Sequence, residues 1–445
     1  MNTKGRDKMT TAMEIGIIAR DNIKPSSPTP AHLKTFKLSL LDQMVPPTYI
    51  PLLLFYPTSD HHRARQLKKS LSETLTRFYP FAGTIKDNAF IECNDNGACF
   101  IEARVSCLLS HILNEPDHEV LKQLLPVNFE SQEEGRGCVL HVQANYFKCG
   151  AMAIGICLSH KIADAATLTT FIKTWAATAS GIGDESVVVP LFNAVSMMPL
   201  KDISIAPPAV EIKQHKSVTK RFVFHSSKIA ALKAKVTNNS VSAEVEHPTK
   251  VETLAALIWK CAMKASRANL GISTRPSALY QNVNIRSRVL PPVPNESIGN
   301  FVGSFIARTS DAETSLHGLV AELRKGILQF CKNAKRVPLF EDISVILQPQ
   351  IEAIGLLCRD DVDFYACTSW CRFQVYEAAD FGWGKPMWVT SANPTCKNMV
   401  IFLDTKDGDG IECLVRLTEE DMKVFECDQE LLAYASLNPS VFKTG

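Results

Sequence analysis

The sequence predicts an α/β protein built from two domains of similar size. The chain has 445 residues, which is more than a single hydrophobic core usually organises. Residues 151–158 form an uncharged run rich in Ala, Ile and Leu, and an amphipathic helix pattern follows directly. Residues 182–219 contain several prolines and little periodicity, which is typical of a connection between domains.

Composition excludes several classes of protein. Lys plus Arg total 48 and Asp plus Glu 46, so no basic excess is available to hold a nucleic acid. No stretch is long and apolar enough to cross a bilayer, and we expect a cytoplasmic protein that does not bind membranes.

The cysteines predict free thiols and no metal site. There are 14 of them, without a CxxC pair. Cys149, Cys157, Cys261 and Cys413 lie in apolar stretches and are expected to be small buried hydrophobic residues. The pair at 367 and 371 has no histidine or carboxylate nearby to complete a metal-ligand pattern.

In the first half, apolar runs predict strands at 36–41, 52–56 and 139–146. A helix is expected at 63–78, because Leu67, Leu71 and Leu75 recur every fourth residue. Residues 94–97 are typical of a hairpin turn.

The central segment places a histidine between a strand and a helix. Residues 151–158 predict a strand buried on both faces, and Leu168, Phe171 and Trp175 lie on one stripe of a helix that closes near residue 181. His160 leaves the carboxyl end of that strand, a position that suits a catalytic base. The alternative is a packed histidine without a catalytic role, and Asp164 can be explained as the helix N-cap.

The second half repeats the alternation of strands and helices. Strands are expected at 220–224 and 279–285, and helices at 227–236, 249–265 and 316–331. Thr249 and Glu252 match a capping box. Residues 238–247 are polar and expected to be mobile. The predicted organisation is a flexible extension at 1–12, with Met13 as an alternative start, then a domain at 13–181, a crossover at 182–219 and a domain at 220–445.

One acidic segment, DTKDGDG at 404–410, resembles a calcium loop. Its closing glutamate would fall on Arg416, so bidentate coordination is missing and a turn before a strand at 411–417 is the better interpretation. Phosphate-binding loops, zinc-protease helices and nucleophile elbows have no matching motif in the sequence.

Two distant motifs carry a family resemblance. HKIAD at 160–164 and DFGWGKP at 380–386 occur together with FYPFAG at 78–83, VNIRSR at 283–288, Gly299-Asn300 and the Thr-Ser-Trp run at 368–370. In this order and spacing they resemble the BAHD family of plant acyl-CoA-dependent acyltransferases. Thr84 departs from the pattern, since the family more often has arginine there.

The resemblance implies a fold and a reaction. The fold would be of the chloramphenicol-acetyltransferase-like type, with a mixed sheet and helices in each domain and a tunnel at their interface. An acyl-CoA would be the co-substrate, a small-molecule alcohol the acceptor, and no cofactor would be tightly bound. A monomer is the expected state. His160 would be the general base in a ternary complex.

The resemblance also suggests roles for other residues. Thr368 and Trp370 would donate to the oxyanion, although Trp370 can equally be a core aromatic residue. Asp164 and Asp380 would act structurally, with Arg286 and Arg288 as the available partners, rather than orient His160 in a triad. Thr249 and Lys250 are candidates for binding coenzyme A, and the alternative is a plain helix N-terminus with an exposed lysine.

By resemblance, acetyl-CoA is the expected donor and an alkaloid, terpenoid or aliphatic alcohol the expected acceptor. A second hypothesis is transfer from a hydroxycinnamoyl- or branched acyl-CoA to a phenolic, amine or sugar acceptor. A third, from another class, is a non-catalytic protein that binds CoA esters.

Overall fold

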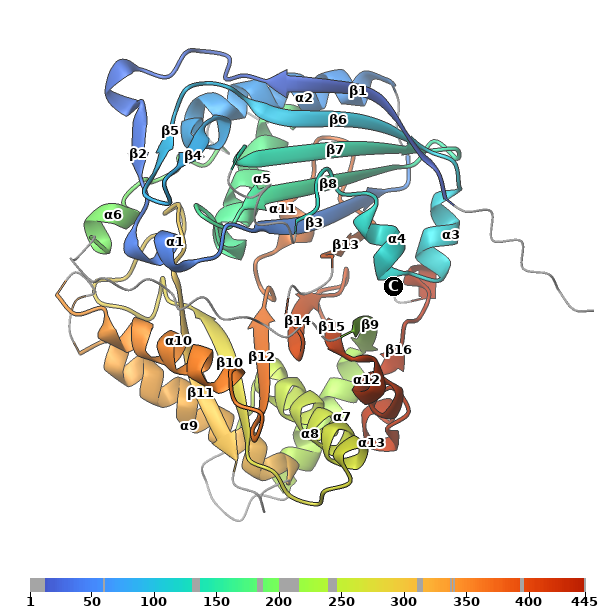
Figure 1. The fold of residues 1–445 in the computed structure, drawn as a ribbon. Helices are drawn as coiled ribbons and strands as arrows, with labels where there is room; N and C mark the ends of the chain where they lie inside the picture. Colours follow the sequence, from blue (N-terminus) through green and yellow to red (C-terminus); the bar gives the residue numbers. More distant parts are fainter. Residues whose placement is uncertain are drawn as a thin grey trace, which may run out of the picture.

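The chain forms two sheet-centred layers, one above the other in Figure 1. The computed structural model describes residues 13–58, 61–129, 137–181, 187–199, 216–238, 246–309, 315–336, 338, 341–392 and 396–443. The extension predicted at 1–12, most of the segment at 238–247 and parts of the crossover lie outside these ranges.

The first layer contains a six-stranded mixed sheet in the order β1-β6-β7-β8-β3-β13. Only β6 and β7 run parallel. The strands are β1 (Ile15–Ile23), β3 (Tyr49–Tyr56), β6 (Ala98–Val105), β7 (Leu140–Phe147), β8 (Met152–Ser159) and β13 (Trp388–Thr390). Because β13 comes from late in the chain, the second half completes the first sheet.

The second layer contains a seven-stranded mixed sheet in the order β11-β10-β12-β14-β15-β9-β16. The pairs β10 with β12 and β12 with β14 are parallel. The strands are β9 (Ser217–Phe224), β10 (Ser277–Asn284), β11 (Val302–Thr309), β12 (Asp363–Ser369), β14 (Met399–Asp404), β15 (Ile411–Thr418) and β16 (Ser436–Leu437). A small sheet joins β2 (Thr35–Lys37), β5 (Phe90–Glu92) and β4 (Thr84–Lys86).

Helices cover these sheets. They are α1 (Leu40–Met44), α2 (His61–Arg77), α3 (Leu109–Asn114), α4 (His118–Lys122), α5 (Ala165–Ser180), α6 (Ala194–Met197), α7 (Ser226–Asn238), α8 (Lys250–Leu270), α9 (Leu316–Ala334), α10 (Ser344–Leu357), α11 (Val375–Ala378), α12 (Glu419–Phe425) and α13 (Gln429–Leu432). No helix within the described ranges is both long and apolar enough to cross a membrane.

Strands β3 and β8 lie at the centre of the first layer and are buried along their whole length. On one face their side chains pack with the apolar stripes of α2 and α5, including Leu71 and Phe171. On the other face they pack with α3 and α4, including Leu113 and Leu121. Each such buried side chain contributes roughly 1.5–3 kcal/mol of transfer free energy. The strand that precedes His160 is therefore held firmly in the core.

Most elements predicted from periodicity are confirmed. The helices expected at 63–78, 165–180, 249–265 and 316–331 correspond to α2, α5, α8 and α9. The Thr249 capping box is present, and Gly181 ends α5 in the left-handed conformation with φ 68°.

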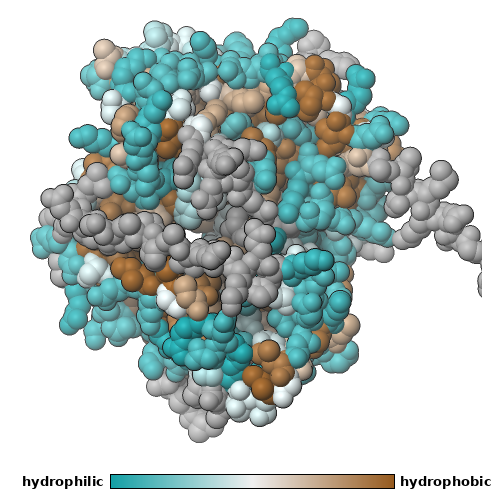
Figure 2. Space-filling model, in the orientation of Figure 1, coloured by the Kyte–Doolittle hydropathy of each residue, from teal (hydrophilic) through white to brown (hydrophobic). Residues whose placement is uncertain are grey.

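On the face shown in Figure 2, hydrophilic residues predominate and the hydrophobic ones form separate patches.

Four local predictions were wrong. The turn at 94–97 is no hairpin, because β5 and β6 belong to different sheets. The strand predicted at 36–41 stops early, since Ser39 caps α1. The crossover, whose little periodicity predicts a plain connection, contains the short helix α6. Cys149 is exposed in the turn after β7, although all 14 cysteines are free thiols as predicted.

Candidate active site

His160 lies immediately after β8, on the side of the first layer that meets the second. Its peptide N–H donates to the carbonyl oxygen of Thr48 over 2.8 Å, which fixes the backbone, and its imidazole is half-buried. Asp164 follows one turn later and caps α5 by accepting from the Thr167 amide over 2.8 Å. The local sequence therefore places the histidine between a buried strand and a capped helix.

The imidazole has one side-chain partner among the described residues, and the backbone of Ala163 also lies within hydrogen-bonding reach of the ring. Nδ1 of His160 lies 3.1 Å from Oδ1 of Asn300. The Asn300 amide nitrogen donates to Oδ1 of Asp42 over 2.9 Å and to the carbonyl oxygen of His160 over 2.7 Å. Both amide hydrogens are thus used, and only the amide oxygen remains for Nδ1.

This arrangement fixes the tautomer of His160. Because Oδ1 of Asn300 can only accept, Nδ1 carries the proton and Nε2 keeps its lone pair. Burial lowers the pKa of His160 below its ordinary value, so the ring stays neutral near pH 7. A neutral imidazole whose Nε2 carries the lone pair is a competent general base.

Among the described residues, no hydrogen bond joins Asp164 to the imidazole of His160. Asp164 pairs with Arg286, with 2.7 Å between Oδ2 and Nη1, and both side chains are almost completely buried. Burial by itself would raise the pKa of Asp164, but the Arg286 guanidinium and its hydrogen bonds hold it below the ordinary value. Oδ2 also accepts from the Phe301 amide over 3.0 Å, so this ion pair supports the segment that carries Asn300.

The residue before Asn300 is a glycine for a geometric reason. Gly299 has φ 135°, and a Cβ there would lie 2.9 Å from the Cβ of Ala194 and 3.5 Å from Oδ1 of Asp42. Its carbonyl oxygen accepts from the hydroxyl of Thr167 over 3.0 Å. Only glycine lets the chain pass this closely while Asn300 faces His160.

Asp380 differs from the expected pairing with an arginine. Its Oδ1 accepts from the amides of Gly382 and Gly384, over 3.0 and 2.9 Å. Arg288 instead donates to the carbonyl oxygen of Asn284, and among the described residues no ion pair involves Asp380. The carboxylate therefore closes the tight turn of the DFGWG motif.

Thr368 and Trp370 lie at the carboxyl end of β12, which points toward the first layer in Figure 1. The Trp370 amide donates to the carbonyl oxygen of Phe402 over 2.8 Å, and its ring packs with Ile401, Leu403 and Leu414. No hydrogen bond joins His160 to either residue in the described part of the chain. The packing agrees with the interpretation of Trp370 as a core aromatic residue, and its oxyanion role stays a proposal.

Comparison with known proteins decides the family. The model of the Transferase family matches residues 13–432. The chain is a BAHD acyltransferase. It is 40% identical to akuammiline synthase 1 of Alstonia scholaris, over 94% of this chain and 97% of that protein. It is 38% identical to a limonoid 1-O-acetyltransferase of Citrus sinensis, over 96% and 100%. The crystal structure of vinorine synthase matches with a TM-score of 0.81 and 32% identity, covering 96% of this chain and 100% of that one.

These matches confirm the predicted fold and class of enzyme. The BAHD acyltransferase has a mixed sheet in each layer and uses an acyl-CoA as co-substrate.

Of the two residues predicted to bind coenzyme A, Lys250 lies near a cavity of the BAHD acyltransferase, within electrostatic reach of its lining residue Asp404. Thr249 caps α8, and Nζ of Lys250 donates to the carbonyl oxygen of Asp409 over 2.7 Å. The cavity has a volume of about 290 Å³. Its lining includes Trp370, Arg372, Asp404, Lys406 and Asp407. Lys250 therefore has a partner and is not a freely exposed lysine.

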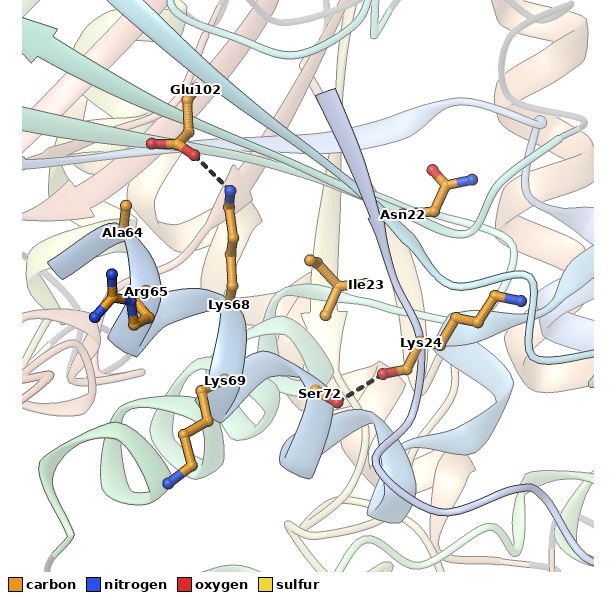
Figure 3. Close-up of a pocket in the computed structure, with 9 residues that line it drawn as sticks. All are labelled: Asn22, Ile23, Lys24, Ala64, Arg65, Lys68, Lys69, Ser72 and Glu102. Carbon is orange, nitrogen blue, oxygen red and sulfur yellow. Dashed lines mark hydrogen bonds and ion pairs between the residues drawn. The ribbon is translucent and has the colours of Figure 1, made fainter. Parts of the chain in front are cut away.

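A larger cavity of about 590 Å³ contains none of the predicted site residues. It lies between α2 and the β1 strand, where Lys24, Arg65 and Lys69 surround Lys68 (Figure 3). Lys68 is already paired with Asp21 and Glu102. Within the described ranges, no cluster of histidine, cysteine or carboxylate side chains has the composition of a metal site.

The acidic turn predicted at 404–410 is confirmed as a turn. Oδ1 of Asp407 accepts from the hydroxyl of Thr405 and from the amides of Asp409 and Gly410, so the loop is closed by its own hydrogen bonds.

Sequence reasoning missed the partner of His160. The family pattern includes Gly299-Asn300 without assigning a role to Asn300, and Asp42 is not among the predicted site residues. The available signal was Ser39 followed three residues later by Asp42, a variant of the capping box, which is present at α1.

Proposed function

We propose that this acyltransferase transfers an acetyl group from acetyl-CoA to a hydroxyl of an alkaloid, terpenoid or other specialised-metabolite alcohol, with His160 as general base. The observation that supports His160 as the general base is its contact with Asn300. With the ring proton on Nδ1, Nε2 is left unprotonated. The names of the relatives, among them a limonoid acetyltransferase, support the donor and the class of acceptor.

The reaction is a direct attack in a ternary complex. Nε2 of His160 takes the hydroxyl proton while the acceptor oxygen bonds to the thioester carbonyl carbon. The tetrahedral intermediate then collapses, the carbon–sulfur bond breaks, and the CoA thiolate takes the proton from Nε2. The products are an ester and free coenzyme A, and His160 returns to its starting state.

Thr368 and Trp370 are proposed donors to the tetrahedral oxyanion. Thr368 lies in β12, where it pairs with Ile401 of β14, and Trp370 follows the end of that strand; their hydroxyl and indole N–H groups have the chemistry that an oxyanion needs. Loss of one such donor costs about 10²–10³ in kcat in other acyl-transfer enzymes, so Trp370→Phe and Thr368→Val should lower kcat with little change in stability.

Coenzyme A is proposed to place its phosphates near the amino end of α8. Lys250 lies there within electrostatic reach of Asp404, beside the cavity lined by Arg372 and Lys406. The cationic side chains and the helix N-terminus favour an anion. A matched pair of variants, Lys250→Met and the exposed Lys228→Met, should separate a higher KM for acyl-CoA from a general charge effect.

We further propose that the enzyme is a cytoplasmic monomer with a tunnel between domains 13–181 and 220–445, linked by 182–219. Strand β13 and the Asp164–Arg286 pair join the two halves, which favours a fixed relation between them.

The test is release of free coenzyme A by purified protein offered acetyl-CoA and a panel of alcohols. We expect release that requires an alcohol, disappears in His160→Ala and persists in the exposed control His111→Ala. If hydroxycinnamoyl- or branched acyl-CoA reacts and acetyl-CoA does not, the proposed donor is wrong. Binding of CoA esters without turnover of any pair would favour the non-catalytic alternative.

A further inference from the structure

We propose that Asp42 is a positioning residue, which holds Asn300 so that the His160 imidazole keeps its proton on Nδ1 and presents Nε2 as a lone pair. This inference rests on the proposed role of His160 as base. It adds a side chain that lies in α1, far from the HxxxD and DFGWG motifs in the sequence.

Asp42 is a buried carboxylate whose contacts are all hydrogen-bond donors. It is 0% exposed. Its Oδ1 accepts from the backbone and side-chain amides of Asn300, over 2.8 and 2.9 Å. Its Oδ2 accepts from the amide and the hydroxyl of Ser39, over 2.9 and 2.6 Å. No ion pair within 4 Å involves Asp42 in the described part of the chain, although the Lys161 ammonium lies within electrostatic reach of it.

A carboxylate is the side chain that satisfies this set of donors. The ionised group accepts at both oxygens and donates at neither. An asparagine at position 42 would place its NH₂ group against the donors of either Ser39 or Asn300, leaving a buried polar group unpaired. Burial of a carboxylate is costly, and the four hydrogen bonds, together with the nearby Lys161 ammonium, offset that cost.

The consequence for His160 follows from the geometry of the amide. With one Asn300 hydrogen directed at Asp42 and the other at the His160 carbonyl oxygen, the amide cannot turn over without losing both bonds. Its oxygen is therefore held toward Nδ1. Without Asp42, a flipped amide would donate to Nδ1 and move the ring proton to Nε2, which removes the base.

The support for Asp42 is itself anchored to the catalytic segment. Lys161, which follows His160, is 1% exposed. Its ammonium group donates to the carbonyl oxygens of Gln43 and Val45, over 2.9 and 2.5 Å. These bonds tie the end of α1 to the residue beside the base. The positions of the Asp42 carboxylate and the His160 imidazole relative to each other are thus fixed.

The direct test is the tautomer of His160 in the free protein, measured by nitrogen-15 NMR of histidine-labelled chain. The chain has 11 histidines, and the His160→Gln spectrum identifies the signal. We expect Nδ1–H in the wild type, and a shift toward Nε2–H or a mixture in Asp42→Asn and in Asn300→Ala. Thr418→Ala, which removes the N-cap of α12, is the stability control and should keep Nδ1–H.

Kinetics give a second readout. In Asp42→Asn we expect kcat to fall about tenfold or more with KM for the acyl donor nearly unchanged, because a misprotonated base affects the chemical step; in serine proteases the wrong histidine tautomer costs on the order of 10⁴. A wild-type His160 with the proton on Nε2, or a folded Asp42→Asn that retains Nδ1–H, would overturn the proposal. If Asp42→Asn does not fold, the wild-type spectrum and Asn300→Ala still decide it. The NMR result needs no substrate, so a failure of the proposed acyl transfer is seen separately.

Discussion

Arg286 holds Asp164 through two hydrogen bonds, Nη1 to Oδ2 over 2.7 Å and Nη2 to Oδ1 over 3.1 Å. The motif aspartate therefore faces an arginine from the other half of the chain, and the amide of Asn300 faces the motif histidine. The two residues of the HxxxD motif thus have different contacts. Its histidine is the proposed general base, and its aspartate forms an ion pair with an arginine from the other half of the chain.

The first prediction concerns this buried pair. Asp164→Ala leaves the Arg286 guanidinium buried without its counter-charge and removes the cap of α5, so we expect the free energy of unfolding to fall by about 3–5 kcal/mol. Urea unfolding followed by circular dichroism measures it. Asp164→Asn keeps a capping oxygen and should lose less than Asp164→Ala.

Asp361→Ala serves as the control, because its pair with Arg359 is largely exposed and should matter little. An Asp164→Ala protein with wild-type stability and no activity would show that Asp164 acts in the reaction itself.

The second prediction separates the two aspartates. Asp380→Ala removes the acceptor of two glycine amides and should lower stability by about 1–3 kcal/mol, with activity falling as the turn loosens. Asp380→Asn retains one acceptor oxygen and should recover much of both. Thermal unfolding and the rate of CoA release are measured on the same preparations. Full loss of activity at unchanged melting temperature would contradict a structural role.

The third prediction compares the two glycines of the DFGWG turn. Both have φ 96°, but a Cβ on Gly382 would lie 3.1 Å from the Cα of Ser180, whereas one on Gly384 would meet nothing within 4 Å. Gly384→Ala should lower the free energy of unfolding by about 1–2 kcal/mol from backbone strain alone. Gly382→Ala should lower it further, because the end of α5 at Ser180 must shift to make room for the new Cβ. Equal losses in urea unfolding would show that the contact with Ser180 is unimportant.

The fourth prediction concerns pH. Burial lowers the pKa of His118 to about 4, and neither ring nitrogen has a hydrogen-bond partner among the described residues. Between pH of about 6.5 and 4 the unfolded chain binds a proton that the folded protein does not, so stability is lost as pH falls through this window. The contribution approaches about 1.4 kcal/mol per pH unit in the middle of it.

The check is the pH dependence of the free energy of unfolding. His118→Gln should make the slope between pH 6.5 and 4 shallower, and the exposed control His111→Gln should leave it unchanged. His141, whose pKa burial also lowers to about 4, contributes a slope of the same sign, so the variant should reduce the slope without abolishing it. An unchanged slope in His118→Gln would contradict the prediction.

The sequence alone determined what depends on near neighbours along the chain. The period of α5, its Asp164 cap and its Gly181 end are local, and so is the position of His160 after a buried strand. These features follow from hydrophobic spacing and backbone capping, which act over a few residues.

Only the tertiary structure decided the surroundings of His160. Asn300 and Asp42 are 258 positions apart in sequence, and β13 reaches β3 across the length of the chain. Asp380 accepts from glycine amides of its own turn, whereas Arg286 pairs with Asp164 and Arg288 donates to the carbonyl oxygen of Asn284. Such contacts depend on how two layers pack, since donors and acceptors of suitable chemistry occur at many positions and packing alone selects the ones that meet.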